Sequence, residues 1–297
     1  MARGDLMMPQ KEIGMERKTA AVIGCGALGS LVAEGISLDL QENWSLAGIY
    51  ARTAEKAQAL ASRFDCAAFG SVEALLAARP DVVVEAAGGD AARQYAEAVL
   101  RSGASLILLS GGVLADGDFA LRLRRAAEQG GSVLWVASGA IGGFDLMRTL
   151  AFHERQLARR GQKPLPGQEL EARVDNFKAP ASLNGAPFLE GADLPADRRV
   201  EVFSGSASEA IAGFPKNVNV AVAAASASAG MERTAVTITS DPALVENTHR
   251  IHVQGFGVRA EMEFASLPDP ENPRSSTMTA WSVLALLDEM SSPVRYF

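Results

Sequence analysis

The feature that most constrains this chain is a glycine-rich motif near its N-terminus. Residues 19–29 read Thr-Ala-Ala-Val-Ile-Gly-Cys-Gly-Ala-Leu-Gly, so an apolar run of strand length ends in three closely spaced glycines. An amphipathic segment over residues 31–38 follows at once. This succession predicts a strand, a tight turn and a helix, which together form the first unit of an α/β fold.

Each glycine has a separate role if the turn binds a dinucleotide. Gly24 allows the turn, Gly26 lets a pyrophosphate approach the backbone, and Gly29 lets the helix pack on the strand. Ala27 and Leu28 then lie at the helix N-terminus, where unpaired N–H groups and the helix dipole favour the phosphates. The alternative is a turn that serves packing alone, and the flanking strand and helix favour dinucleotide binding over it.

The residues after the second predicted strand, residues 46–50, bear on the choice between NAD and NADP. An acid at this point binds the ribose 2′-hydroxyl of NAD, whereas a basic residue suits the 2′-phosphate of NADP. Here the chain reads Ala51, Arg52 and Thr53, with no acid. The pattern favours NADP, or the use of both cofactors, and the alternative is that Arg52 is a solvated loop residue.

Further strand and helix units follow the first two. Apolar strands are predicted at residues 82–84, 105–109 and 132–137, each followed by a glycine-containing loop. This alternation predicts a Rossmann-type doubly wound parallel sheet over residues 19–143, and we expect residues 1–18 to be a flexible extension. Glu85 ends the strand at 82–84, and its two interpretations are a cap on the next helix and a contact with the cofactor.

The pattern changes after residue 143. A helix with apolar residues at helical spacing is followed by five segments of period-two alternation, at residues 170–177, 200–203, 235–239, 250–255 and 258–264. They predict an α+β domain over residues 144–271, built on a mixed or antiparallel sheet that serves the substrate, catalysis and oligomerisation. A helix is predicted over residues 216–229, and the last helix, in the segment 272–297, is expected to pack back on the first domain.

Composition argues against several classes of protein. The 297 residues carry 28 basic and 35 acidic side chains, a net charge of −7, and no basic stripe interleaved with aromatic residues, so a nucleic acid partner is not expected. The two cysteines show no metal-binding spacing, and no metal is expected. No apolar run reaches the length of a membrane span, and residues 1–18 lack the apolar centre of a signal peptide, so a cytoplasmic location is expected.

Several short motifs in fixed order identify a family. They are Gly-Ala-Ile-Gly-Gly at 139–143, Phe-Pro-Lys-Asn-Val-Asn-Val at 214–220, Asp-Pro at 241–242, Asn-x-His at 247–249, Gly-Phe-Gly at 255–257 and Asn-Pro-Arg-Ser-Ser at 272–276. Together they resemble the L-aspartate dehydrogenases, and the likeness covers nearly all of the chain after residue 18. Residues 274–276 are a departure, because Arg-Ser-Ser stands where Lys-Thr-Ser is usual.

The resemblance implies an activity and roles for individual residues. The activity is the NAD- or NADP-dependent oxidation of L-aspartate to iminoaspartate, which can supply NAD biosynthesis or hydrolyse to oxaloacetate and ammonia. Ala140 matches the loop residue whose backbone amide contacts the cofactor, Asn219 the cofactor-binding asparagine, and His249 the proposed catalytic histidine. A homodimer or higher homo-oligomer is implied as well, with hydrophobic strand faces of the second domain as the candidate interface.

The proton chemistry of such a reaction suits a histidine, whose pKa lies near the operating pH. The chain has three, His153, His249 and His252, and His153 falls in a helix where a structural role is expected. Side chains alternate along a strand, so His249 and His252 should point to opposite faces. We expect His249 to be the general base, and a hydrogen-bonded structural histidine is the alternative.

Aspartate also brings two carboxylates, which cations and hydroxyl groups bind well. The candidates that sit in motifs are Lys216, Arg274, Ser275 and Ser276. Two other functions stay open at this point. One is a dehydrogenase of the same architecture that acts on another small amino acid or amine, and the other is a non-catalytic NAD(P)-binding sensor.

Overall fold

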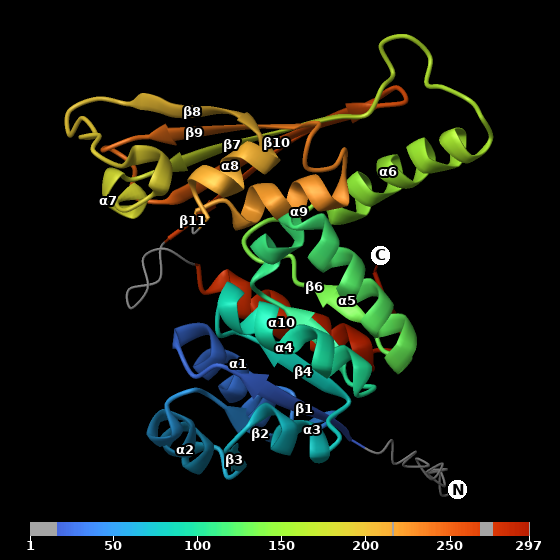
Figure 1. Cartoon of the computed structure of the whole chain (residues 1–297), viewed down its shortest axis with the longest axis vertical. Coiled ribbons are helices and arrows are strands. Elements are labelled where there is room, and N and C mark those ends of the chain that lie inside the picture. The colour runs from blue at the N-terminus through green and yellow to red at the C-terminus, as the bar shows by residue number, and fades with distance from the viewer. Residues whose placement is uncertain (1–16, 216, 268–275, 297) are drawn as a thin grey trace, which may run out of the picture.

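The computed structural model describes residues 17–215, 217–267 and 276–296. Two layers of structure lie one above the other, each built around its own sheet (Figure 1). The predicted extension over residues 1–18 falls almost entirely outside the described residues. The first strand, β1 (Lys18–Ile23), begins at Lys18.

The first domain is a six-stranded parallel sheet with strand order β3-β2-β1-β4-β5-β6. This order reverses between β1 and β4, as in a dinucleotide-binding fold, and it confirms the predicted Rossmann-type architecture. After β1 its elements are α1 (Ala27–Leu38), β2 (Trp44–Tyr50), α2 (Ala54–Arg63), β3 (Ala67–Phe69), α3 (Val72–Ala77), β4 (Val82–Glu85), α4 (Gly89–Arg101), β5 (Ser105–Leu108), the 3-10 helix η1 (Gly111–Ala115), α5 (Gly117–Gly130) and β6 (Leu134–Val136).

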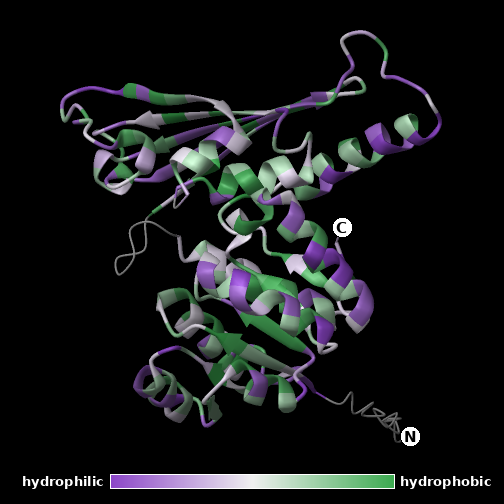
Figure 2. Cartoon of the chain, in the orientation of Figure 1, coloured by the Kyte–Doolittle hydropathy of each residue, from purple (hydrophilic) through white to green (hydrophobic). Residues whose placement is uncertain are grey.

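Two apolar layers hold this sheet, one on each face. Ala20 and Val22 of β1 pack with α1, whereas Ala21 and Ile23 point to the other face and pack with α4 and α5. Because both faces are covered, the strands are apolar throughout and not alternating. Figure 2 shows the result, with hydrophobic strands inside and hydrophilic outer faces on the helices.

The second domain is a five-stranded mixed sheet with strand order β11-β10-β7-β9-β8, in which only β7 and β9 run parallel among the paired strands. This confirms the prediction of a mixed or antiparallel sheet. Its elements are α6 (Phe144–Arg159), β7 (Glu171–Lys178), α7 (Pro180–Leu183), the 3-10 helix η2 (Pro187–Leu189), β8 (Val200–Ser206), α8 (Ala207–Gly213), α9 (Asn219–Ala227), β9 (Thr234–Ser240), β10 (Asn247–Gly255) and β11 (Val258–Ser266).

The two faces of this sheet differ in character. Apolar side chains such as Val174, Ile238 and Ile251 are fully buried on the face that α6, α8 and α9 cover (Figure 1). The other face carries charged side chains, among them Arg173 and Arg250. The helices thus cover the hydrophobic strand face, and the expectation of a subunit interface on the strand faces of this domain stays a prediction.

The helix predicted over residues 216–229 is shorter in the structure, because α9 begins at Asn219. A turn precedes it, in which the Asn217 N–H donates to the Phe214 carbonyl oxygen. The Asn217 side chain donates to the carbonyl oxygen of Ser182, so this segment is tied to α7 instead of continuing the helix.

The last helix, α10 (Met278–Ser291), lies against α1 of the first domain. The Trp44 indole N–H donates to the Leu287 carbonyl oxygen over 2.9 Å. A Cβ at Gly35 of α1 would lie 2.3 Å from Leu284 Cδ1, so the two helices approach closely because Gly35 has no side chain. None of the helices in the described residues is long and apolar enough to cross a membrane.

Candidate active site

A cleft of about 550 Å³ lies between the two domains. The loops after β4, β5 and β6 border it from the first domain, at the edge where open α/β sheets bind their ligands. From the second domain come the end of β7 and the starts of β10 and α9. Five residues singled out in the sequence line it, namely Leu28, Ala140, Asn219, His249 and Ser276.

The glycine motif has the geometry that a dinucleotide requires. A Cβ at Gly24, where φ is +115°, would lie 2.6 Å from the Ala86 carbonyl oxygen. One at Gly29 would lie 2.3 Å from the Gly24 carbonyl oxygen, whereas one at Gly26 would meet nothing within 4 Å. Gly24 and Gly29 therefore allow close backbone packing, and the open space at Gly26 leaves room at the start of α1, where a pyrophosphate is predicted.

Glu85 connects the two loops that form one wall of the cleft. Its side chain is 1% exposed and accepts hydrogen bonds from the N–H groups of Ala87, Gly88 and Ser110 and from the Ser110 hydroxyl. Desolvation raises the pKa of this carboxyl, and those hydrogen bonds act in the opposite direction. Glu85 thus binds N–H groups just before α4 and also joins two loops that are 25 residues apart in sequence, while its contact with the cofactor stays a prediction.

The two domains are in direct contact where α9 meets η1, beside the cleft. Asn219 is the first residue of α9, and a Cβ at Gly112 would lie only 2.5 Å from its Oδ1 atom. The loop that carries Ala140 is positioned nearby, where Gly139 at φ +66° donates its N–H to the Ser282 hydroxyl of α10. Asn219 and Ala140 thus border the cleft from opposite domains.

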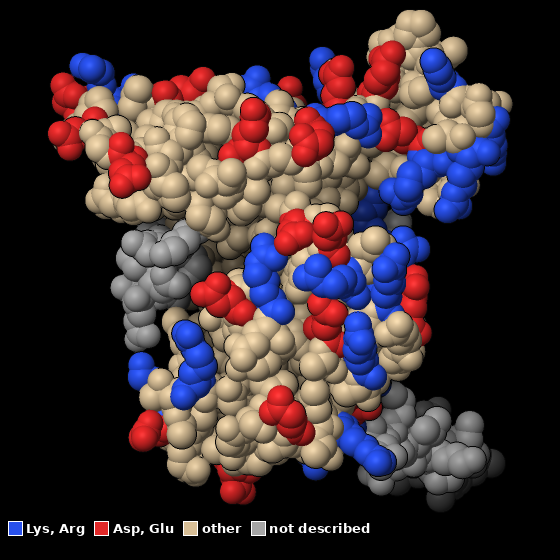
Figure 3. Space-filling model, viewed as in Figure 1, with Lys and Arg blue, Asp and Glu red and all other residues tan. Residues whose placement is uncertain are grey.

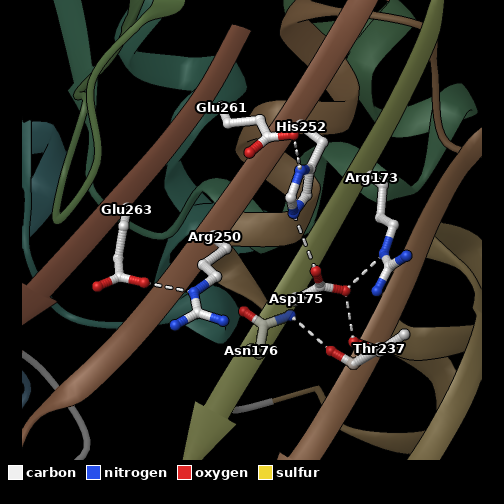
Figure 4. Close-up of polar contacts among 8 residues, drawn as sticks. All are labelled: Arg173, Asp175, Asn176, Thr237, Arg250, His252, Glu261 and Glu263. Carbon is white, nitrogen blue, oxygen red and sulfur yellow. Dashed lines mark hydrogen bonds and ion pairs between the residues drawn. The ribbon is translucent and has the colours of Figure 1, made fainter.

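His249 lies on the buried face of β10 and is 3% exposed. Its Nδ1 atom is 2.8 Å from Asn176 Oδ1 on the neighbouring strand β7. The Asn176 side-chain nitrogen donates to the Thr237 carbonyl oxygen (Figure 4), which leaves the Asn176 oxygen to accept from the histidine. The proton of His249 therefore sits on Nδ1, and Nε2 carries a lone pair.

The surroundings also keep His249 neutral. Burial lowers its pKa well below the usual value of 6.5, and the nearby Lys178 ammonium acts in the same direction. A neutral imidazole with an unprotonated Nε2 can accept a proton at neutral pH.

Lys178 is a cleft residue that the sequence analysis missed. It ends β7, is 6% exposed, and donates to Asn247 Oδ1 over 3.3 Å. Burial lowers its pKa to about 8. The alternation of side chains along β7 could have indicated that Lys178 is buried, because Ala172 and Val174 point inward and Asn176 and Lys178 continue that series. The sequence analysis predicted that the strand ends at residue 177 and so left Lys178 out.

Of the four substrate-binding candidates from the sequence, the structure describes Ser276 alone. Ser276 is 5% exposed and lines the cleft, and its hydroxyl oxygen accepts the Met278 N–H over 3.2 Å. Lys216, Arg274 and Ser275 lie outside the described residues.

The remaining predicted residues lie away from the cleft. His252 points to the opposite face of β10 from His249 and contacts Asp175 and Glu261 (Figure 4). His153 is exposed on α6, its ring 4.2 Å from that of Phe256. Arg52 lines a second hollow next to the glycine motif.

Comparisons with known proteins match both halves of the chain. The family model described as "Aspartate dehydrogenase, C-terminal" matches residues 167–290, and the one described as "Homoserine dehydrogenase, NAD binding domain" matches residues 24–137. L-aspartate dehydrogenase 2 of Bordetella bronchiseptica is 37% identical over 271 residues, which are 90% of this chain and 94% of that protein.

L-aspartate dehydrogenase of Methanosarcina barkeri is 32% identical over 279 residues, 92% of this chain and 97% of that protein. Among solved structures, aspartate dehydrogenase from Thermotoga maritima superposes with a TM-score of 0.69 at 24% identity, covering 95% of this chain and all of that one. At that identity the likeness supports the fold.

Proposed function

The chain belongs to the L-aspartate dehydrogenase family, and on that premise we propose that it oxidises L-aspartate at the α-carbon with NAD(P)⁺. One observation carries this proposal: the buried, neutral His249 and the buried Lys178 line the same cleft, close to the glycine turn that has open space at Gly26. The product is iminoaspartate, which hydrolyses to oxaloacetate and ammonia.

His249 has the geometry of a general base. When bound, the nicotinamide ring of the cofactor accepts the hydride that leaves the α-carbon. His249 Nε2 takes the proton that the amine loses as the carbon–nitrogen double bond forms. After this nitrogen has released that proton to solvent, it takes a proton from the water that attacks the imine, while Asn176 holds the imidazole through Nδ1.

Lys178 supplies a positive charge for a substrate carboxylate. Its pKa of about 8 keeps it protonated at neutral pH, and no carboxylate of the described residues pairs with it. The Ser276 hydroxyl lines the same cleft and can donate to a carboxylate oxygen. Lys216, Arg274 and Ser275 stay predictions for the second carboxylate.

Substitution of His249 tests the proposed base. We expect His249→Ala to lower kcat by about 10²- to 10⁴-fold, because the proton then has no acceptor at the reacting atoms. NAD(P)H fluorescence should show unchanged cofactor binding. His252→Ala, on the opposite face of the same strand, should keep kcat within about twofold of the unaltered protein. Near-normal kcat and aspartate affinity in His249→Ala would exclude the assignment.

A substrate panel separates the proposed activity from the two alternatives. We expect reduction of NAD(P)⁺ with L-aspartate and little with D-aspartate, L-glutamate, L-alanine or L-malate. Turnover of another amino acid or amine instead of L-aspartate would indicate a different dehydrogenase. Tight cofactor binding without any turnover would indicate a sensor.

Three further features of the chain are proposals as well. A homo-oligomer is supported by family membership and by the sheet face that no helix of the described residues covers, and light scattering on the purified protein tests it. A cytoplasmic location and a supply of iminoaspartate to NAD biosynthesis remain predictions, which cell fractionation and metabolite labelling check. The domain boundaries at residues 143 and 271 stay predictions that limited proteolysis tests.

A further inference from the structure

A second hollow of about 240 Å³ opens beside the glycine motif, at the ends of β1 and β2. Ala86 and Ala87 line both this hollow and the main cleft, so the two spaces meet at the turn that carries Gly24 and Gly26. Tyr95 of α4 also borders the hollow, its hydroxyl 3.1 Å from that of Tyr50. A dinucleotide that spans the turn with its nicotinamide in the cleft would place its adenosine half here.

The charges around this hollow are positive. Arg52 and Lys56 line it, and no aspartate or glutamate of the described residues does. The position just after β2, where an acid would bind the ribose hydroxyls of NAD, is Ala51. Asp90 borders only a smaller adjoining space that Arg52 also lines.

Arg52 and Lys56 are also unpaired. Neither forms a hydrogen bond or an ion pair with any residue in the described part of the chain, although the protein is acidic overall. Several other arginines of the first domain are paired with carboxylates, as the pairs of Arg63 with Glu34 and of Arg93 with Asp116 show, whereas the exposed Arg125 has no such partner among the described residues. Arg52 and Lys56 differ from Arg125 because both line the same hollow, where a ligand can reach them together.

A third polar group lies between these two cations. Thr53 is the N-cap residue of α2, yet its side chain makes no capping hydrogen bond, so its hydroxyl stays available to a ligand. Lys56 is three residues further, which places it about one helical turn away and on the same side. A lysine in the first turn is electrostatically unfavourable for the helix itself.

We propose that Arg52, Thr53 and Lys56 bind the 2′-phosphate of NADP(H) and make this protein prefer NADP(H) to NAD(H). The inference rests on the proposed function only in that the protein binds a nicotinamide dinucleotide. The planar guanidinium of Arg52 can donate two parallel hydrogen bonds to a phosphate, and the Lys56 ammonium adds a point charge.

Equilibrium binding without substrate tests this proposal. NADPH and NADH are titrated separately into the purified protein and followed by nicotinamide fluorescence. We expect NADPH to bind at least about tenfold more tightly than NADH, the size of one charge-assisted hydrogen bond. In Arg52→Ser/Lys56→Ser we expect this preference to disappear through weaker NADPH binding, with NADH affinity within about threefold.

Arg125→Ser is the matched control, because it removes one positive charge from an exposed position on α5 that lies outside the hollow and has no ion-pair partner among the described residues. It should leave both affinities unchanged. Equal or tighter binding of NADH by the unaltered protein, or equal losses for both cofactors in the double variant, would overturn the proposal. Aspartate turnover is measured separately, so a protein that turns over aspartate with NAD alone refutes this inference and leaves the proposed function standing.

Discussion

At the scale of single residues, the buried Lys178 shows how a binding group can reduce stability. Its pKa is about 8 in the fold, whereas a lysine in the unfolded chain titrates near 10.5. Below pH 8 both states carry the proton, and the full cost of burying the charge is present. Between pH 8 and 10.5 only the unfolded chain holds the proton, so the stability of the fold rises with pH across this window.

Lys178→Met should therefore stabilise the protein while it impairs catalysis. At pH 7 we expect the free energy of unfolding to rise by on the order of 2 kcal/mol, because an apolar side chain replaces a buried charge. The KM for aspartate should rise at least about tenfold through loss of a charged contact. Urea unfolding and steady-state kinetics measure the two effects.

The pH dependence of the unfolding free energy tests whether the charge on Lys178 causes this difference in stability. The difference in unfolding free energy between Lys178→Met and the unaltered protein should shrink as the pH rises from 8 to 10.5. A difference that stays constant across this range would show that Lys178 is not the group that titrates.

At the scale of elements, the active site depends on strands β7 and β10 presenting the same face to the cleft. His249 pairs with Asn176 across the antiparallel ladder, and Lys178 contacts Asn247 at the end of the same pairing. A shift of β10 by one residue would turn His249 and Asn247 toward the other face, away from Asn176 and Lys178. The register that buries Val174 and Ile251 thus also assembles the polar site.

The contact between η1 and α9 gives a prediction for cofactor binding. A Cβ in Gly112→Ala would overlap Asn219 Oδ1, so the asparagine side chain must leave its present position. We expect the Kd for NADPH to rise about tenfold, as when a hydrogen bond to a charged ligand is lost. Gly117→Ala in α5 is the control, because a Cβ there meets nothing within 4 Å. Fluorescence titration that gave equal Kd values for both variants would contradict this role of Asn219.

At the scale of the whole molecule, the chain returns to its first domain through α10. Leu284 fills the space above Gly35, and Leu287 accepts the Trp44 indole N–H. Leu28 of α1 and Ser276 and Thr279 near the C-terminus all line the cleft, so segments from both ends of the chain border it. Over the face shown in Figure 3, acidic and basic side chains are interspersed on the first domain.

A double-mutant cycle tests the contact between α1 and α10. Gly35→Ala alone should destabilise the protein by about 1–2 kcal/mol, because its Cβ overlaps Leu284. In a Leu284→Ala background the same change should stabilise by about 0.5–1 kcal/mol, since alanine favours a helix over glycine. Urea denaturation measures both steps, and additive effects would show that the two positions are not in contact.

The sequence by itself determined whatever depends on local periodicity and turn chemistry. The glycine spacing and the repeated strand and helix units predicted the parallel sheet, and the period-two segments predicted the mixed sheet. Each of these patterns involves only residues that are close together in the sequence. The opposite orientations of His249 and His252 followed in the same way. The sequence predicted helix boundaries less accurately, because α9 begins at Asn219 and not at residue 216 as predicted.

Only the tertiary structure decided what depends on contacts between distant segments. Four features of the site depend on contacts between separate elements. They are the burial that lowers the pKa of Lys178, the tautomer that Asn176 imposes on His249, the hydrogen bonds by which Glu85 joins two loops, and the fit of Asn219 against Gly112. Local patterns carry no information on such partners, because burial and hydrogen bonding arise only when the elements pack. The sequence thus determined which side chains can take part in proton transfer and charge binding. The packing of the elements decided which of these side chains are buried together and which of their atoms carry the protons.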